Sequence, residues 1–159
     1  MAVKEHALSA RRIVSKSFPL DRRNTRYVYP SKIEATPTGY ACTTVTKAPG
    51  ERYRTHRVRV QMPKDFTGRF TECDSVRCDC DCGRYTFVWN YALWAAEAAI
   101  RDRTNHKAPV MTNPSMSPGC CKHLLVVLQG LVLVNPTWPP RSRARPGVGV
   151  RSLKQVLRK

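Results

Sequence analysis

The sequence predicts an α+β fold, in which a small core of strands and helices carries an extended basic segment at each end. Residues 38–62 are rich in β-branched residues, and apolar residues alternate with polar ones over part of this segment. Both features are typical of strands. Residues 84–101 and 124–134 are apolar and suited to helices, whereas both ends of the chain are basic. We therefore divide the chain into a basic arm at 1–37, a core at 38–136 and a basic tail at 137–159.

Residues 1–37 are predicted to form an arm without a core of their own. They contain 8 lysines and arginines but only 3 acidic residues, and no sustained apolar period is visible. Tyr27 and Tyr29 are candidate points of attachment to a partner. Charges interrupt every short apolar stretch, so we expect no signal peptide.

Two strands are expected next, at Tyr40–Thr46 and Tyr53–Met62, with a turn at 48–50 between them. The second strand alternates in character along its length. Its expected buried side carries an imidazole and three apolar side chains: His56, Val58, Val60 and Met62. Arg57 and Arg59 lie on the opposite, basic side.

Residues 64–71 are expected to form a loop around Gly68, before a short strand that carries Cys78. A helix is predicted over 84–101, because apolar residues recur at steps of three and four. Trp89 and Trp94 should lie in the core against residues 124–134.

The run 124–134 is the most apolar stretch, and at 11 residues it is too short to cross a bilayer. We expect a buried helix from His123 to about Gln129, with a strand allowed after Gly130. In the tail, prolines and glycines argue against regular structure until about Val150, after which a short amphipathic helix is expected.

Cysteines and one histidine form the most informative pattern. Cys78, Cys80 and Cys82 alternate with aspartates, and 40 residues separate Cys80 from the segment Cys121–His123. Two thiols at positions i and i+2, with a distant thiol and imidazole at the same spacing, suit tetrahedral zinc. Such a site would join a strand to a helix start and contribute directly to folding free energy.

Alternatives remain for the seven cysteines. They could form disulfides in an exported protein, but their number is odd and no secretory leader is predicted. Inert buried thiols are the third option, and Cys42 and Cys73 have no partner at metal spacing. Cys80 with Cys82 is an alternative ligand pair to Cys78 with Cys80, and Cys120 is an alternative to Cys121.

The pattern Cys-x-Cys, a long spacer and Cys-x-His resembles the SWIM-type zinc finger, which implies a finger at 78–123. Roughly over residues 75–128, the chain also resembles small structural proteins of tailed bacteriophages. The segments that carry this likeness are Val76–Cys80, Tyr85–Trp89, Thr112–Met116 and Pro118–Leu124. The register of this resemblance implies four zinc ligands, with Cys82 and Cys120 as alternates: Cys78, Cys80, Cys121 and His123.

The charge of the chain predicts an acidic partner. The 28 lysines and arginines exceed the 11 acidic residues, for a formal net charge of +17. Such an excess favours nucleic acid, an acidic protein surface, or both. The candidate contact residues are arginines of the strand region and of the tail: Arg52, Arg54, Arg57, Arg59, Arg141, Arg143 and Arg145.

Catalysis is not expected, because four protein ligands leave no open position for an activated water. No histidine is followed two residues later by a glutamate, and no phosphate-binding glycine loop or serine elbow is present. The expectation is a non-enzymatic structural protein of a tailed-phage virion, in the head, tail or connector. It would assemble with other virion proteins in the host cytoplasm, with no membrane segment and no small-molecule substrate. The alternative is a nucleic-acid-binding, SWIM-like zinc finger protein that contacts DNA.

Overall fold

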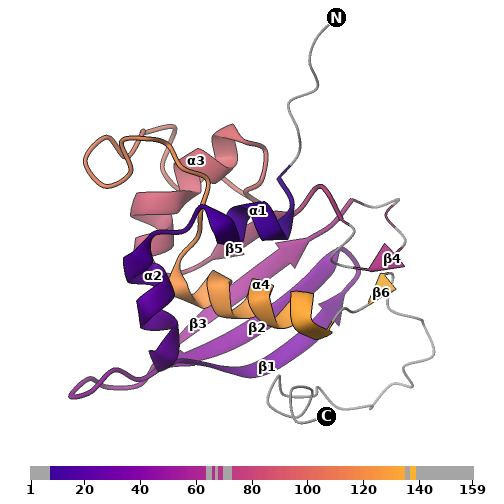
Figure 1. Ribbon diagram of the computed structural model, residues 1–159, viewed down its shortest axis with the longest axis horizontal. Helices are drawn as coiled ribbons and strands as arrows, with labels where there is room; N and C mark the ends of the chain where they lie inside the picture. The colour runs from indigo at the N-terminus through magenta and orange to yellow at the C-terminus, as the bar shows by residue number, and fades with distance from the viewer. Residues whose placement is uncertain (1–7, 64–65, 67, 70–72, 135–136, 139–159) are drawn as a thin grey trace, which may run out of the picture.

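A four-stranded antiparallel sheet forms the centre of the computed structural model, which describes residues 8–63, 66, 68–69, 73–134 and 137–138 (Figure 1). The strand order is β1-β2-β3-β5. The strands are β1 (Val28–Thr36), β2 (Gly39–Thr46), β3 (Arg54–Gln61) and β5 (Arg77–Cys80). Helices α1 (Ala10–Ser15) and α4 (Lys122–Val134) lie across one face of this sheet. The fold is therefore mixed α and β, as the sequence predicts.

The predicted β2–β3 pair is present with the expected alternation. Val58 and Val60 are buried, while Arg57 and Arg59 are exposed on the opposite face of β3. The turn between the strands is closed by a hydrogen bond from the Glu51 amide to the Ala48 carbonyl. Gly50 has a φ of 75° there, a conformation that glycine adopts without steric cost.

The prediction of an N-terminal arm is corrected for the described part of residues 1–37. This part forms α1, α2 (Pro19–Asn24), the 3₁₀ turn η1 (Thr25–Tyr27) and β1. Ile13 is fully buried, and the Phe18 ring lies 4.3 Å from the ring of Trp89. The two helices have 6 residues each, which is too short for an apolar period to show in the sequence.

The predicted helix 84–101 ends earlier than expected. It begins at Gly83, widens into a π-helical stretch, η3 (Tyr85–Trp89), and continues as α3 (Asn90–Ala95). Glu97 has a φ of 56° and reverses the chain, so that Ala98–Ile100 runs beside β5. The small side chains of Ala98 and Ala99, which favour a helix in the sequence, here allow close approach to the strand.

The two tryptophans of this helix have different environments. Trp89 is fully buried, as predicted, whereas Trp94 is 36% exposed and contacts the rings of Tyr91 and His106. Trp94 is thus not a core residue. It lies on the outward-facing side of α3.

Helix α4 is longer than predicted, because it continues through Gly130 to Val134 without a change to a strand. Two-residue strands β4 (Gly68–Arg69) and β6 (Thr137–Trp138) pair with each other near its end (Figure 1). None of the described helices combines the length and apolar character needed to cross a membrane. The tail predicted at 137–159 lies outside the described residues apart from β6.

Candidate metal centre

Three thiols and one imidazole meet where β5 ends and α4 begins. Cys80 is the last residue of β5, and Cys82 follows two residues later in the turn before η3. Cys121 directly precedes α4, and His123 lies in its first turn. The four ligand atoms all lie within 4.8 Å of one another, and all four residues are buried. A buried group of this composition fits a metal ion.

The orientation of His123 is set by two neighbours. Its Nε2 atom is hydrogen-bonded to the Thr46 hydroxyl at 2.8 Å. Its Nδ1 atom faces the sulfur atoms of Cys80 and Cys121, each at 3.9 Å. Nδ1 is therefore the nitrogen that can bind a metal, and with a metal bound there Nε2 would carry the proton and donate a hydrogen bond to the Thr46 hydroxyl.

His56 and Asp81 form a layer outside this group. The His56 ring lies 4.2 Å from the His123 ring, measured between centroids. Asp81 accepts hydrogen bonds from His56 Nδ1 at 3.0 Å and from the Arg57 backbone amide at 3.1 Å. These contacts connect β3 to the turn that carries Cys82, and so they support the position of that ligand.

The thiols of the group differ in proton affinity. Hydrogen bonds from the Cys121 and Cys80 thiols lower the pKa of Cys82, and the nearby His123 acts in the same direction. Burial raises the pKa of Cys121. The three thiols lie close enough to affect one another's proton affinity, and a bound cation would favour their deprotonation.

The ligand set predicted with Cys78 is revised by this geometry. Cys80, Cys121 and His123 come together as predicted, but the fourth member is the alternate Cys82. The Cys78 thiol instead donates to the Ala98 carbonyl at 3.6 Å. Residues i and i+2 of a strand are about 6.6 Å apart along the chain, whereas two thiolates on one tetrahedral zinc are separated by only about 4 Å. The chain has left strand β5 before Cys82, so the Cys82 thiol can come as close to the Cys80 thiol as one zinc ion requires.

The other alternate, Cys120, lies outside the group. Its thiol contacts the Ser17 hydroxyl at 3.4 Å, and burial raises its pKa to about 12. Burial also raises the pKa of Cys78 well above its usual range. All seven cysteines, including the buried Cys42 and Cys73, are free thiols, so the disulfide alternative has no support in the structure.

The strand arginines do not form one groove. Arg54 lines a cavity of about 310 Å³ at the metal centre, together with His56, Lys122 and Arg84. Arg57 and Arg59 point to the opposite face of the sheet, and Arg52 is exposed in the segment before β3. Arg141, Arg143 and Arg145 lie outside the described residues.

Sequence reasoning missed the residues that surround the ligands. Thr46 is 77 positions from His123 in the chain, and the packing of α4 across the sheet brings the two side chains together (Figure 1). Nothing in the local sequence of Thr46 separates it from the other threonines of β2. His56 was expected on the buried side of its strand, and the structure places it there, half-buried beside the His123 ring.

No protein family model matches this chain, and comparisons with curated proteins and with solved structures found no match either.

Proposed function

We propose that this chain is a non-enzymatic structural protein whose fold is stabilised by one zinc ion bound to Cys80, Cys82, Cys121 and His123. The observation that carries this proposal is the buried group of four ligand atoms at the junction of β5 and α4. Thiolates and imidazole in a tetrahedral arrangement are the donors that structural zinc sites use.

A structural role is favoured over a catalytic one by the number of donors. Catalytic zinc has three protein ligands and keeps a fourth position for water or substrate. Here four protein atoms can complete a tetrahedral sphere, and all four residues are buried. The ion would then connect the end of the sheet to α4, which supplies free energy to the folded state only.

The larger biological role rests on the resemblance of the sequence. With Cys80 and Cys82 as the first pair, the ligand order is still Cys-x-Cys followed by Cys-x-His, the pattern of a SWIM-type finger. The resemblance over residues 75–128 to structural proteins of tailed phages supports a place in a virion. The net charge of +17 supports contact with acidic neighbouring subunits in that assembly.

Zinc analysis of the purified protein tests the proposal, with Cys78 as an internal control. We expect zinc near one per chain, and loss of cooperative unfolding after chelation. Cys82→Ser should weaken zinc binding by more than the ~10–100-fold typical of changes next to a ligand. Cys78→Ser should keep the zinc content, because Cys78 is equally buried but is no ligand.

Cobalt substitution identifies the donors independently of stability. The thiolate-to-cobalt absorption should decrease in Cys82→Ser and remain in Cys78→Ser. Loss of this absorption in Cys78→Ser with retention in Cys82→Ser would restore the ligand set first predicted. Protein purified without metal, with unfolding insensitive to chelator, would refute the zinc site altogether.

A further inference from the structure

The face of the sheet opposite α4 carries a row of arginines. Arg57 and Arg59 alternate with the buried Val58 and Val60 on β3, so they project away from the helices. The strand register pairs Gln61 of β3 with Arg77 of β5, which places Arg77 on this same face. Helices α1 and α4 lie on the other side of the sheet (Figure 1).

These arginines lack partners of opposite charge among the described residues. Arg57, Arg59 and Arg77 are all exposed, and no carboxylate of a described residue lies within ion-pair distance of their guanidinium groups. The positive charge of this row is therefore not cancelled within the described part of the chain, and it is available to a ligand.

The acidic residues near this row are already engaged. Asp79, which pairs with Arg59 in the strand register, is buried and accepts two hydrogen bonds from Arg103, at 2.7 and 2.8 Å. It also lies 3.5 Å from Arg101, whose side chain is 56% exposed and adds to the basic surface. Asp81, at the end of the row, is held by His56 and by the Arg57 backbone amide.

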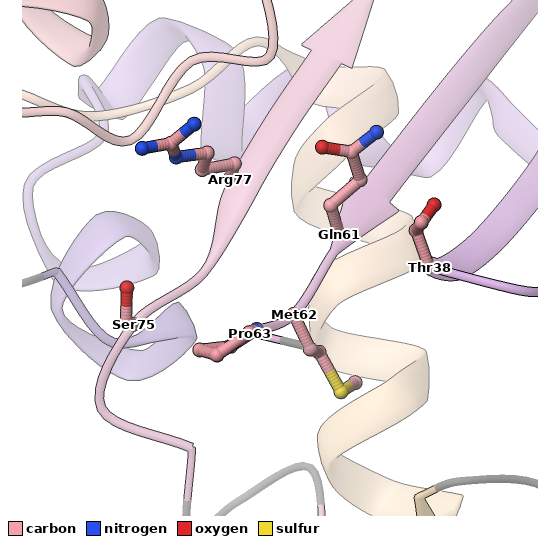
Figure 2. A pocket seen from close by; sticks show the side chains of 6 residues that line it. All are labelled: Thr38, Gln61, Met62, Pro63, Ser75 and Arg77. Atoms are coloured by element: carbon pink, nitrogen blue, oxygen red, sulfur yellow. The ribbon is translucent and has the colours of Figure 1, made fainter. Parts of the chain in front are cut away.

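A pocket of about 310 Å³ lies at one end of the row, where β3 leaves the sheet (Figure 2). It is lined by Thr38, Gln61, Met62, Pro63, Ser75 and Arg77. Among the described residues, the lining contains one guanidinium, one amide and two hydroxyl groups, which can all donate hydrogen bonds, and no carboxylate. Figure 2 shows Arg77 and Gln61 on neighbouring strands, with the apolar Met62 side chain turned away from their polar ends. This arrangement suits a phosphate oxygen.

The composition of the face favours nucleic acid over a protein partner. Among the large apolar side chains that are exposed in the described residues, Tyr29 of the edge strand β1 lies on this face, by its register with Val45, and none lies on β2, β3 or β5. Protein interfaces have an apolar centre, whereas contacts to a phosphate backbone need only cations and hydrogen-bond donors. We propose that Arg57, Arg59, Arg77 and Arg101 bind the phosphodiester backbone of nucleic acid, with the Arg77 pocket holding one phosphate.

This surface differs from the set expected from the sequence. Arg54 is excluded because it lies at the metal centre, and Arg77 and Arg101 are added by the strand pairing and by the contact with Asp79. The proposal does not depend on the zinc ion acting as a ligand for nucleic acid. Cys80 pairs with the buried Val58 in the strand register and so lies on the α4 side of the sheet, which means that the two proposals can fail separately.

A DNA-binding measurement tests the proposal. The full chain is titrated into a labelled DNA duplex of random sequence, and fluorescence anisotropy gives the affinity at several salt concentrations. The variant Arg57→Gln, Arg59→Gln, Arg77→Gln removes three charges from the face. If each arginine contacts one phosphate, the slope of log affinity against log salt should become shallower by about 2 to 3, at ~0.9 per contact. Binding at fixed low salt should weaken at least tenfold.

The matched control removes three charges from the helical side of the molecule. Arg11, Arg12 and Arg23 are exposed residues of α1 and α2, so their change to Gln alters the net charge equally. The control should keep the wild-type slope. An equal loss in both variants would mean that net charge alone drives binding, and it would overturn the assignment of the face.

Two further results would also overturn the proposal. One is the absence of DNA binding by the wild-type protein. The other is competition by poly-glutamate as effective as that of DNA of the same charge, which would indicate an acidic protein partner. Metal content, measured on every variant, reports folding. If the triple variant loses its metal, the single variants replace it, each with an expected slope change of about 0.9.

Discussion

The hydroxyl of Thr46 determines which nitrogen of His123 is free to bind a metal. A histidine that ligates through one nitrogen normally donates the proton on the other to a fixed acceptor. Thr46 Oγ1 is that acceptor, at 2.8 Å, and both residues are buried. Without the hydroxyl, the imidazole would lose both its preferred proton position and its orientation towards the three sulfur atoms.

Thr46→Val tests this role with little change in shape. The buried Nε2–H of His123 would lose its acceptor, and we expect zinc affinity to decrease by about 10–100-fold. Competition with a chelating dye measures this affinity directly. Thr43→Val is the control, because Thr43 lies on the same strand but pairs with Arg57 on the opposite face. An unchanged zinc affinity in Thr46→Val would show that sheet contacts alone position His123.

Residue types and spacing predicted the chemistry of the site, but they did not predict which of the candidate cysteines belong to it. The presence of thiols near position 80 and of Cys121 and His123 was readable from the chain, because metal donors are rare and their spacing is informative. The choice between Cys78 and Cys82 was not, since it depends on where β5 ends. A strand that continued by two residues would have separated Cys80 from Cys82 as it separates Cys78 from Cys80.

At the scale of elements, Gly119 sets the distance between the start of α4 and the N-terminal helices. A Cβ atom built at Gly119 would lie 2.7 Å from the Lys16 carbonyl oxygen and from the Cα atom of Ser17. Both are backbone atoms of the turn between α1 and α2, so neither can move alone. Gly119 is followed by Cys120 and Cys121, and its fit therefore affects the metal centre.

Gly119→Ala should destabilise the protein by about 1–3 kcal/mol, as overpacking of a tight contact does. Gly83→Ala is the matched control. Gly83 lies at the start of the helix that continues into η3, and its Cβ would meet only the Phe87 ring at 3.9 Å. Alanine should be neutral there or stabilise the helix by up to ~1 kcal/mol. Denaturant unfolding of the zinc-loaded proteins measures both changes, and equal losses in the two variants would contradict the steric argument.

Elements with a long periodic pattern were predictable, and short ones were not. Alternation along β3 and the apolar run of α4 each extend over enough residues to define one buried face. Helices α1 and α2 have only 6 residues each, and the helix after η3 ends where Glu97 takes a positive φ. Such features depend on tertiary contacts that leave little trace in the local sequence.

At the scale of the whole molecule, residues 8–27 belong to the core although their composition is that of a basic arm. Ser17 accepts a hydrogen bond from the Cys120 amide at 2.9 Å, next to Cys121 of the candidate metal centre. Asp21 is buried and accepts two hydrogen bonds from Arg84, at 2.7 and 2.8 Å, at the start of the helix after Cys82. The N-terminal segment thus supports both segments that carry the candidate metal-binding residues.

Deletion of residues 1–27 should therefore abolish the folded, metal-binding state, because it uncovers Trp89 and removes the contacts at Cys120 and Arg84.

Within the full chain, Ile13→Ala removes a fully buried side chain and should cost about 2–5 kcal/mol. The double variant Arg11→Gln, Arg12→Gln removes charge from the same segment but leaves its buried side chains, and it should change stability by no more than about 0.5 kcal/mol. Metal content and thermal unfolding distinguish these outcomes. A core segment cannot be removed without exposing the apolar surface that it covers. A truncated chain that binds zinc and unfolds like the full protein would therefore mean that residues 1–27 are the separable arm that their charge suggests.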